Sequence, residues 1–174
     1  MLVLKLITIL GLILVFIQDM KSRAVSWVIF PLLAVALLLL YGLDHRGLGG
    51  KWIPALFNTI FLVLQLVLIS IYFSLRNRKW TNVSGGLLGW GDILLLFCCA
   101  FYLSALNFLL FYISSLILVI LIWSLAEKRG VKESRGVPLA GLQALFFGVF
   151  LIQDWTLHWF SLTDDYWLLN LMTR

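Results

Sequence analysis

Two aspartates at the edges of apolar segments are the residues of this chain that could do chemistry. Asp92 opens a long run without charge that ends at Glu127, and Asp19 follows an apolar run near the N-terminus. Ionisable groups in such places are costly to desolvate and often have a function when they face the interior of a helix bundle. Two carboxylates held close together share a proton, so one can act as general base and the other as general acid.

The composition is that of a helical integral membrane protein. Of the 174 residues 63% are hydrophobic and 12% charged, and the mean hydropathy is +1.05. A soluble domain is roughly half apolar and a quarter charged. The apolar runs are continuous, unlike the alternating strands of an outer-membrane barrel.

Metal and cofactor chemistry is not indicated by the sequence. Cys98 and Cys99 are adjacent, lie inside an apolar run and lack zinc-type or CxxC spacing, which favours buried small apolar residues. His45 and His158 lie in different regions without ligand spacing. We therefore predict no metal and no organic cofactor.

The apolar runs predict six membrane-spanning helices, since each span needs about 20 residues. Runs of suitable size lie near 2–18, 25–43, 53–75 and 136–152. The long run after Asp92 is predicted to hold two short spans joined by a tight turn near 104–108. We expect an all-α polytopic membrane domain over 1–152. The mixed segment 153–174 is expected to form an amphipathic tail along the outer interface.

The basic residues orient these helices. Most of the 13 lysines and arginines follow the first, third and fifth predicted spans. They are Lys21 and Arg23; Arg76, Arg78 and Lys79; and Lys128, Arg129, Lys132 and Arg135. The positive-inside rule places these loops in the cytoplasm, as in a bacterial inner (plasma) membrane, and explains the net charge of +5 without a nucleic-acid partner. Asp19 then ends the first span, and Asp92 begins the fourth, at the same cytoplasmic depth.

Two acids at one depth predict the chemistry of an aspartic protease. One carboxylate would activate a water molecule and the other would protonate the leaving amine. Gly89 and Gly91 would permit a break before the helix and leave room for an extended peptide. A structural interpretation stands beside this one: Asp92 can be a helix N-terminal residue favoured by the helix dipole, and Asp19 can pair with the basic residues after it.

A family resemblance follows from the order of the motifs. Gly89-Trp90-Gly91-Asp92 resembles the GxGD motif of intramembrane aspartyl proteases. Its place at the start of the fourth predicted span, with an earlier Asp after the first, resembles the type IV prepilin peptidase family. The first motif of that family is an Asp followed by a short basic stretch, and here Asp19 precedes Lys21 and Arg23.

The last motif and the departures from the family define a minimal member. An Ile-Pro-Phe-Gly-like segment opens the last span in the family, and 136–141, with Pro138, stands in that place here. Leu94 occupies a position that is often Lys in the family, and Ser26 stands where the first motif has Pro. The chain also lacks the loop with paired cysteines that accompanies methyltransferase activity in the larger enzymes. The resemblance covers about 1–150 and implies a peptidase-only form.

The resemblance implies an aspartyl endopeptidase that removes the short basic leader of type IV pilin-like or pseudopilin-like precursors at the cytoplasmic membrane boundary. The implied catalytic pair is Asp19 and Asp92. The implied residues that bind substrate or shape the site are Gly89, Gly91, Lys21, Arg23 and Pro138. Two alternatives remain from other classes: a catalytically silent assembly factor for a pilus or secretion system, and a small proton-coupled transporter.

Overall fold

The computed structural model describes residues 1–44, 49–77, 89–128, 138–157 and 161–172. Over these ranges the chain is helical and contains no strand, as the sequence predicts. The helices are α1 (Leu2–Ser22), α2 (Ile29–Asp44), α3 (Trp52–Asn77), α4 (Trp90–Tyr102), α5 (Ala105–Lys128), α6 (Leu139–Leu157) and α7 (Tyr166–Met172).

Among the described helices, four are long and apolar enough to cross a membrane: α1, α3, α5 and α6. The helices α2 and α4 are apolar but shorter, with 16 and 13 residues. Many large apolar side chains of the long helices are exposed on the outside of the bundle, for example Leu10 and Ile60. Such a surface suits a lipid environment better than water. The chain is therefore a helical membrane protein.

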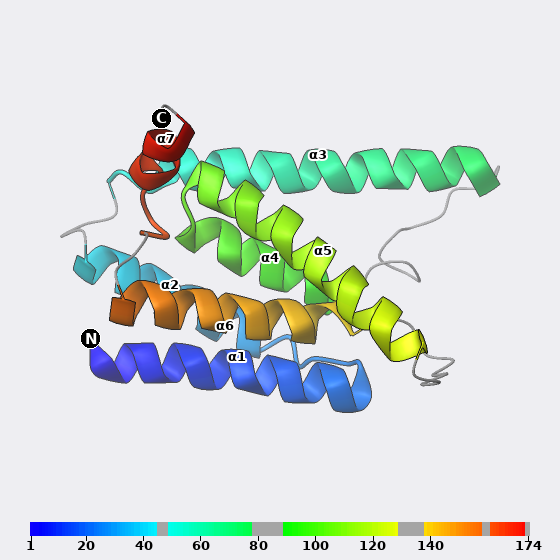
Figure 1. Ribbon diagram of the computed structural model, residues 1–174, viewed down its shortest axis with the longest axis horizontal. Coiled ribbons are helices and arrows are strands. Elements are labelled where there is room, and N and C mark those ends of the chain that lie inside the picture. The colour runs from blue at the N-terminus through cyan, green and yellow to red at the C-terminus, as the bar shows by residue number, and fades with distance from the viewer. Residues whose placement is uncertain (45–48, 78–88, 129–137, 158–160, 173–174) are drawn as a thin grey trace.

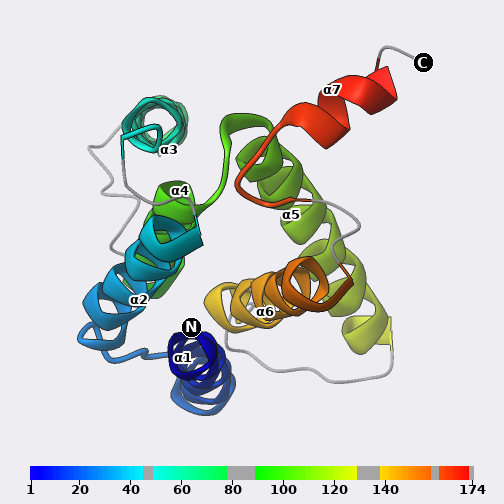
Figure 2. The same ribbon diagram turned by 90° about the vertical axis from the view of Figure 1, so that its left-hand side faces the viewer.

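The first six helices lie side by side and run in alternating directions (Figures 1 and 2). Contacts between neighbours form a ring in the order α1, α2, α4, α3, α5, α6, which closes where α6 packs on α1. A further contact between α4 and α6 crosses the ring. It divides the bundle into one half built from α1, α2, α4 and α6, and another built from α3, α4, α5 and α6.

Aromatic packing joins α5 to α6. The ring of Phe111 is fully buried and stacks on Phe146, with centroids 5.9 Å apart. It also meets Phe147 edge-on at 5.4 Å and Phe150 at 6.1 Å. Aromatic pairs in these geometries add to the stabilisation that comes from burial alone. The middle of α6 is therefore packed against α5 on one side, and the helix also packs against α1.

The tight turn predicted near 104–108 lies slightly earlier, because α4 ends at Tyr102 and α5 already begins at Ala105. Asp165, just before α7, caps the start of α5 from a distant part of the chain. Its Oδ1 accepts hydrogen bonds from the backbone N–H groups of Leu106 (3.1 Å) and Asn107 (3.4 Å). The hydroxyl of Ser104 donates to the same oxygen at 2.6 Å. These contacts satisfy N–H groups that a helix start leaves free, and they fix the tail to the bundle.

The other side of this turn is held by two buried polar side chains. Lys51 is 2% exposed, and its Nζ donates to the carbonyl oxygens of Tyr102 and, at 3.1 Å, Leu103. The Nδ2 atom of Asn58 donates at 3.1 Å to the carbonyls of Ala100 and Leu103. The carbonyl groups that the end of α4 leaves free are thus bonded inside the protein.

Candidate active site

Asp19 lies in the last turn of α1 and is only 7% exposed. Its Oδ2 accepts a 2.6 Å hydrogen bond from the backbone N–H of Gly141, in the first turn of α6. The helix ends directly afterwards: Arg23 adopts the left-handed conformation (φ 53°), and its N–H donates to the Asp19 carbonyl at 3.0 Å. A helix N-terminus favours a nearby carboxylate through its free N–H groups and its dipole.

Gly141 makes this contact possible because it has no side chain. A Cβ atom at this position would lie 3.1 Å from both Cβ and Oδ2 of Asp19 and 3.3 Å from the carbonyl oxygen of Phe16. Pro138, the residue that the sequence singled out in this segment, is buried just before α6, and its carbonyl accepts from Leu142 at 3.4 Å. Gly141 is not among the site residues predicted from the sequence, although a glycine in the first turn after a helix-starting proline is a usable signal of close approach.

Asp92 is the third residue of α4 and is 8% exposed. Its Oδ2 accepts a 3.0 Å hydrogen bond from the N–H of Gly89, and a Cβ at Gly89 would lie 3.1 Å from the same oxygen. This return contact is half of a capping box, so the structural interpretation of Asp92 has a basis in the geometry. The backbone N–H of Ala140, in α6, also points to the Asp92 carboxyl and favours its charged form.

The structure brings the two aspartates together at the first turn of α6. Asp19, in α1, accepts a hydrogen bond from Gly141, and Asp92, in α4, lies next to Ala140. The two carboxyl groups are near enough for a negative charge on Asp19 to disfavour a negative charge on Asp92. Two buried carboxyl groups that repel each other share a proton more readily than they both ionise, which is the state that general acid–base catalysis needs.

The remaining site candidates divide into those near the pair and those away from it. Arg23 belongs to the first group, because its positive charge favours the charged form of Asp19. The Lys21 side chain is exposed. A Cβ at Gly91 would lie 3.5 Å from Cγ2 of Val25 and 3.7 Å from Cβ of Ala140, both ordinary contacts. Gly91 therefore lies where α4, α6 and the connection after α1 pack together.

The part of the chain that the structure describes holds no group of three or more His, Cys, Asp or Glu that could bind a metal ion. Cys98 and Cys99 are free and buried, and the Cys98 thiol donates to the Phe30 carbonyl at 3.3 Å. His45 and His158 lie outside the described residues.

No protein-family model, curated protein or solved structure matches this chain. The interpretation of the site therefore depends on its motifs and its geometry.

Proposed function

We propose that the chain is a membrane-embedded aspartyl endopeptidase that removes the short basic leader of prepilin-like precursors at the cytoplasmic boundary of the inner membrane. The observation that supports this most strongly is the meeting of Asp19 and Asp92 at the first turn of α6. In this proposal α1–α6 are the six spans, with α2 and α4 as the short members. The aspartate end of the bundle faces the cytoplasm, and the tail lies at the outer interface.

The reaction would use the two carboxyl groups in complementary states. The ionised aspartate takes a proton from a water molecule, whose oxygen bonds to the carbonyl carbon of the scissile peptide. The protonated aspartate gives its proton to the leaving nitrogen as the C–N bond breaks, so one water is consumed and one carboxyl and one amine are formed. The two groups titrate as a pair, and either can take either role. The N–H groups of Gly141 and Gly89 would hold the carboxyl groups in place without transferring a proton to them.

The substrate in this proposal has a basic leader, a glycine before the cleavage site and an apolar helix after it. The positive charges of Lys21 and Arg23 would repel a basic leader rather than attract it. Recognition therefore depends on where the helix sits in the membrane and on the carboxyl pair at the boundary where water is present.

The test is cleavage of a co-expressed prepilin-like precursor, followed by the mobility shift of the mature product. Asp19→Asn and Asp92→Asn are compared with the wild type and with Asp44→Asn. Asp44 is an exposed aspartate at the C-terminal end of α2, the end that lies away from α1's Asp19. We expect mature product from the wild type and from Asp44→Asn only, with every variant inserted in the membrane. Mature product from Asp19→Asn or Asp92→Asn would refute the aspartyl mechanism. A variant that supports pilus or secretion assembly without any cleavage would instead favour the assembly factor.

A further inference from the structure

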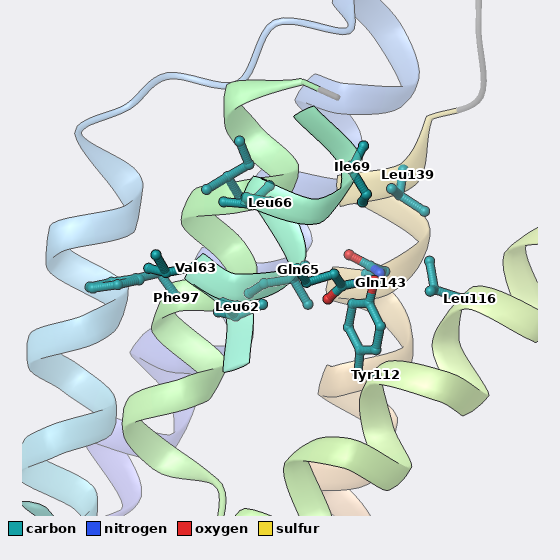
Figure 3. Close-up of a pocket in the computed structure, with 12 residues that line it drawn as sticks. Leu62, Val63, Gln65, Leu66, Ile69, Phe97, Tyr112, Leu116, Leu139 and Gln143 are labelled. Carbon is teal, nitrogen blue, oxygen red and sulfur yellow. Dashed lines mark hydrogen bonds between the residues drawn. The ribbon is translucent and has the colours of Figure 1, made fainter. Parts of the chain in front are cut away.

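A cavity of about 200 Å³ lies in the half of the bundle built from α3, α4, α5 and α6 (Figure 3). Its wall consists mainly of leucine, isoleucine and other apolar side chains from all four helices. Ile93 of α4 and Leu139 of α6 line it, and they are the chain neighbours of Asp92 and Ala140. The cavity therefore begins beside the aspartate pair and extends from there along α4 and α6.

The helices α3 and α5 form the side of the cavity that faces away from α1 and α2. They are in contact near the start of α5, where the ring of Phe61 lies 6.3 Å from Phe108 and 5.9 Å from Tyr112. Towards the aspartate end they diverge (Figure 1). A helix in the bilayer can therefore approach the cavity between α3 and α5.

One part of the cavity wall is polar. The amide groups of Gln65 and Gln143 and the hydroxyl of Tyr112 gather there (Figure 3). The Nε2 atom of Gln65 donates to Tyr112, and that of Gln143 donates to Ser115 at 3.3 Å. Gln143 is completely buried, yet its Oε1 accepts no hydrogen bond from any residue that the structure describes. A buried amide oxygen in an apolar surrounding calls for a donor, and an occupant of the cavity can supply it.

The occupant must combine apolar groups with a hydrogen-bond donor. The hydrocarbon tail of a lipid has no donor. Within a transmembrane helix the N–H groups are bonded internally, except for those of the first turn. In the proposed substrate that first turn follows the cleavage site and so lies next to Asp19 and Asp92, where the cavity begins.

We infer that this cavity seats the first turn of the substrate's apolar helix, so that an apolar side chain fills it and a free backbone N–H bonds Oε1 of Gln143. The inference rests on the proposed function and identifies a substrate-binding site for it. The helix enters between α3 and α5, and its first turn is positioned with the preceding peptide bond over the carboxyl pair. Gln143 is then a positioning residue and not a catalytic one.

The first experiment detects docking without hydrolysis. The probe is a co-expressed prepilin-like precursor with a basic leader, a glycine before the cleavage site and an apolar helix, and the enzyme carries Asp92→Asn. A photoreactive benzophenone residue replaces either Leu116, in the cavity, or Ile13, in an apolar groove of about 160 Å³ between α1 and α6. We expect light-induced adducts with the first turn of the probe at position 116, at least about tenfold more than at position 13.

Equal adducts at both positions, adducts with lipid alone, or no adduct at position 116 would overturn the inference. The same comparison in the wild type, with a probe made uncleavable at its glycine, guards against an effect of Asp92→Asn on folding. Because neither arm needs turnover, a failure of docking is distinguished from a failure of the aspartyl mechanism, which the cleavage of the wild type tests separately.

The second experiment tests whether the cavity selects substrates by the size of the apolar side chain in their first helical turn. Leu116→Trp reduces the space, and we expect it to raise KM by about tenfold or more for a probe with phenylalanine in the first turn. For a probe with alanine there, KM should change little. Gln143→Leu should raise KM with kcat nearly unchanged for both probes, because it removes a contact made in the ground state and the transition state alike. Equal losses with the phenylalanine and alanine probes in Leu116→Trp would overturn the inference.

Discussion

The backbone N–H of Gly141 lies 2.6 Å from Oδ2 of Asp19, although 122 positions separate the two residues in the chain. This bond joins the end of α1 to the start of α6, and Asp92 reaches the same turn from α4. A carboxyl group held by a backbone donor in a packed helix has little freedom to rotate. The position of Asp19 therefore depends on the packing of α1 on α6, which gives the first prediction.

Gly141→Ala should sharply reduce the proposed cleavage activity. The added Cβ would lie 3.1 Å from Asp19 and 3.3 Å from the Phe16 carbonyl, so α1 and α6 must move apart. A misplacement of about 1 Å at a catalytic group can cost roughly 100-fold in rate. Gly148→Ala, on the same helix face, is the control, because its Cβ would meet Leu12 at an ordinary 3.8 Å. Comparable activity of the two variants in the precursor assay would contradict the prediction.

Gly89→Ala should reduce activity more than Gly91→Ala. A Cβ at Gly89 would lie 3.1 Å from Oδ2 of Asp92 and would turn this carboxyl away from the N–H that holds it. At Gly91 the added methyl would make only ordinary contacts with Val25 and Ala140. Initial rates on the same precursor measure the difference, and an equal or reversed order would show that the carboxyl does not depend on Gly89.

Asp165→Ala should destabilise the protein by about 1–2 kcal/mol, the usual effect of losing a helix N-cap. Its Oδ1 bonds the first N–H groups of α5 and the Ser104 hydroxyl. The neighbouring Asp164→Ala removes the same charge from an exposed side chain and should change stability by less than about 0.5 kcal/mol. Reversible unfolding of the purified protein in detergent gives both values. If the two variants were equally stable, the cap would contribute nothing measurable.

Lys51 should make the protein more stable as the pH rises above 7. It lies in the turn before α3, where burial lowers its pKa to about 7, and the charge of Asp165 opposes this shift only in part. Below pH 7 the folded protein bears the full penalty of a buried charge. Between pH 7 and about 10 the unfolded chain binds more protons than the folded one, so stability rises by at most about 1.4 kcal/mol per pH unit.

The unfolding free energy in detergent, measured from pH 6 to pH 9, checks this slope. Lys51→Met should be less stable overall, because the carbonyl of Tyr102 loses its donor, but it should lose the pH dependence. Lys21→Met, which removes an exposed charge, is the matched control. A slope that persists in Lys51→Met would assign the effect to another group.

Much of the helical plan could be predicted from the sequence, because long apolar runs and the separation of basic loops are strong signals. The predicted break in the long apolar run exists, but it lies at Leu103 and Ser104, and Asn107 is already inside α5. The predicted start of the second helix at 25 was too early. The connection after α1 is held by a bond from the Ser26 N–H to Oε1 of Gln18 at 2.9 Å, and α2 begins only at Ile29.

The tertiary polar contacts could not be predicted in the same way. In the sequence, Lys51 lies in a loop between apolar runs, as an ordinary interfacial lysine does. In the structure it is buried, because its Nζ bonds the end of α4 and lies 4.5 Å from the ring of Tyr41. Gln143 lies in an apolar run and could have been singled out as a buried amide. Its partner, Ser115, depends on how α5 and α6 pack, which periodicity alone does not determine.

The length of α4 has a consequence for the bilayer. A helix rises 1.5 Å per residue, so the 13 residues of α4 extend about 20 Å, against about 30 Å for the hydrocarbon core of a membrane and about 39 Å for the 26 residues of α3. As one of the six proposed spans, a helix this short would create a hydrophobic mismatch, which a bilayer relieves by thinning locally. In the proposed orientation, lipid acyl-chain length would set how far water descends to reach Asp92, so the thickness of the host membrane would be one of the variables that affect the proposed activity.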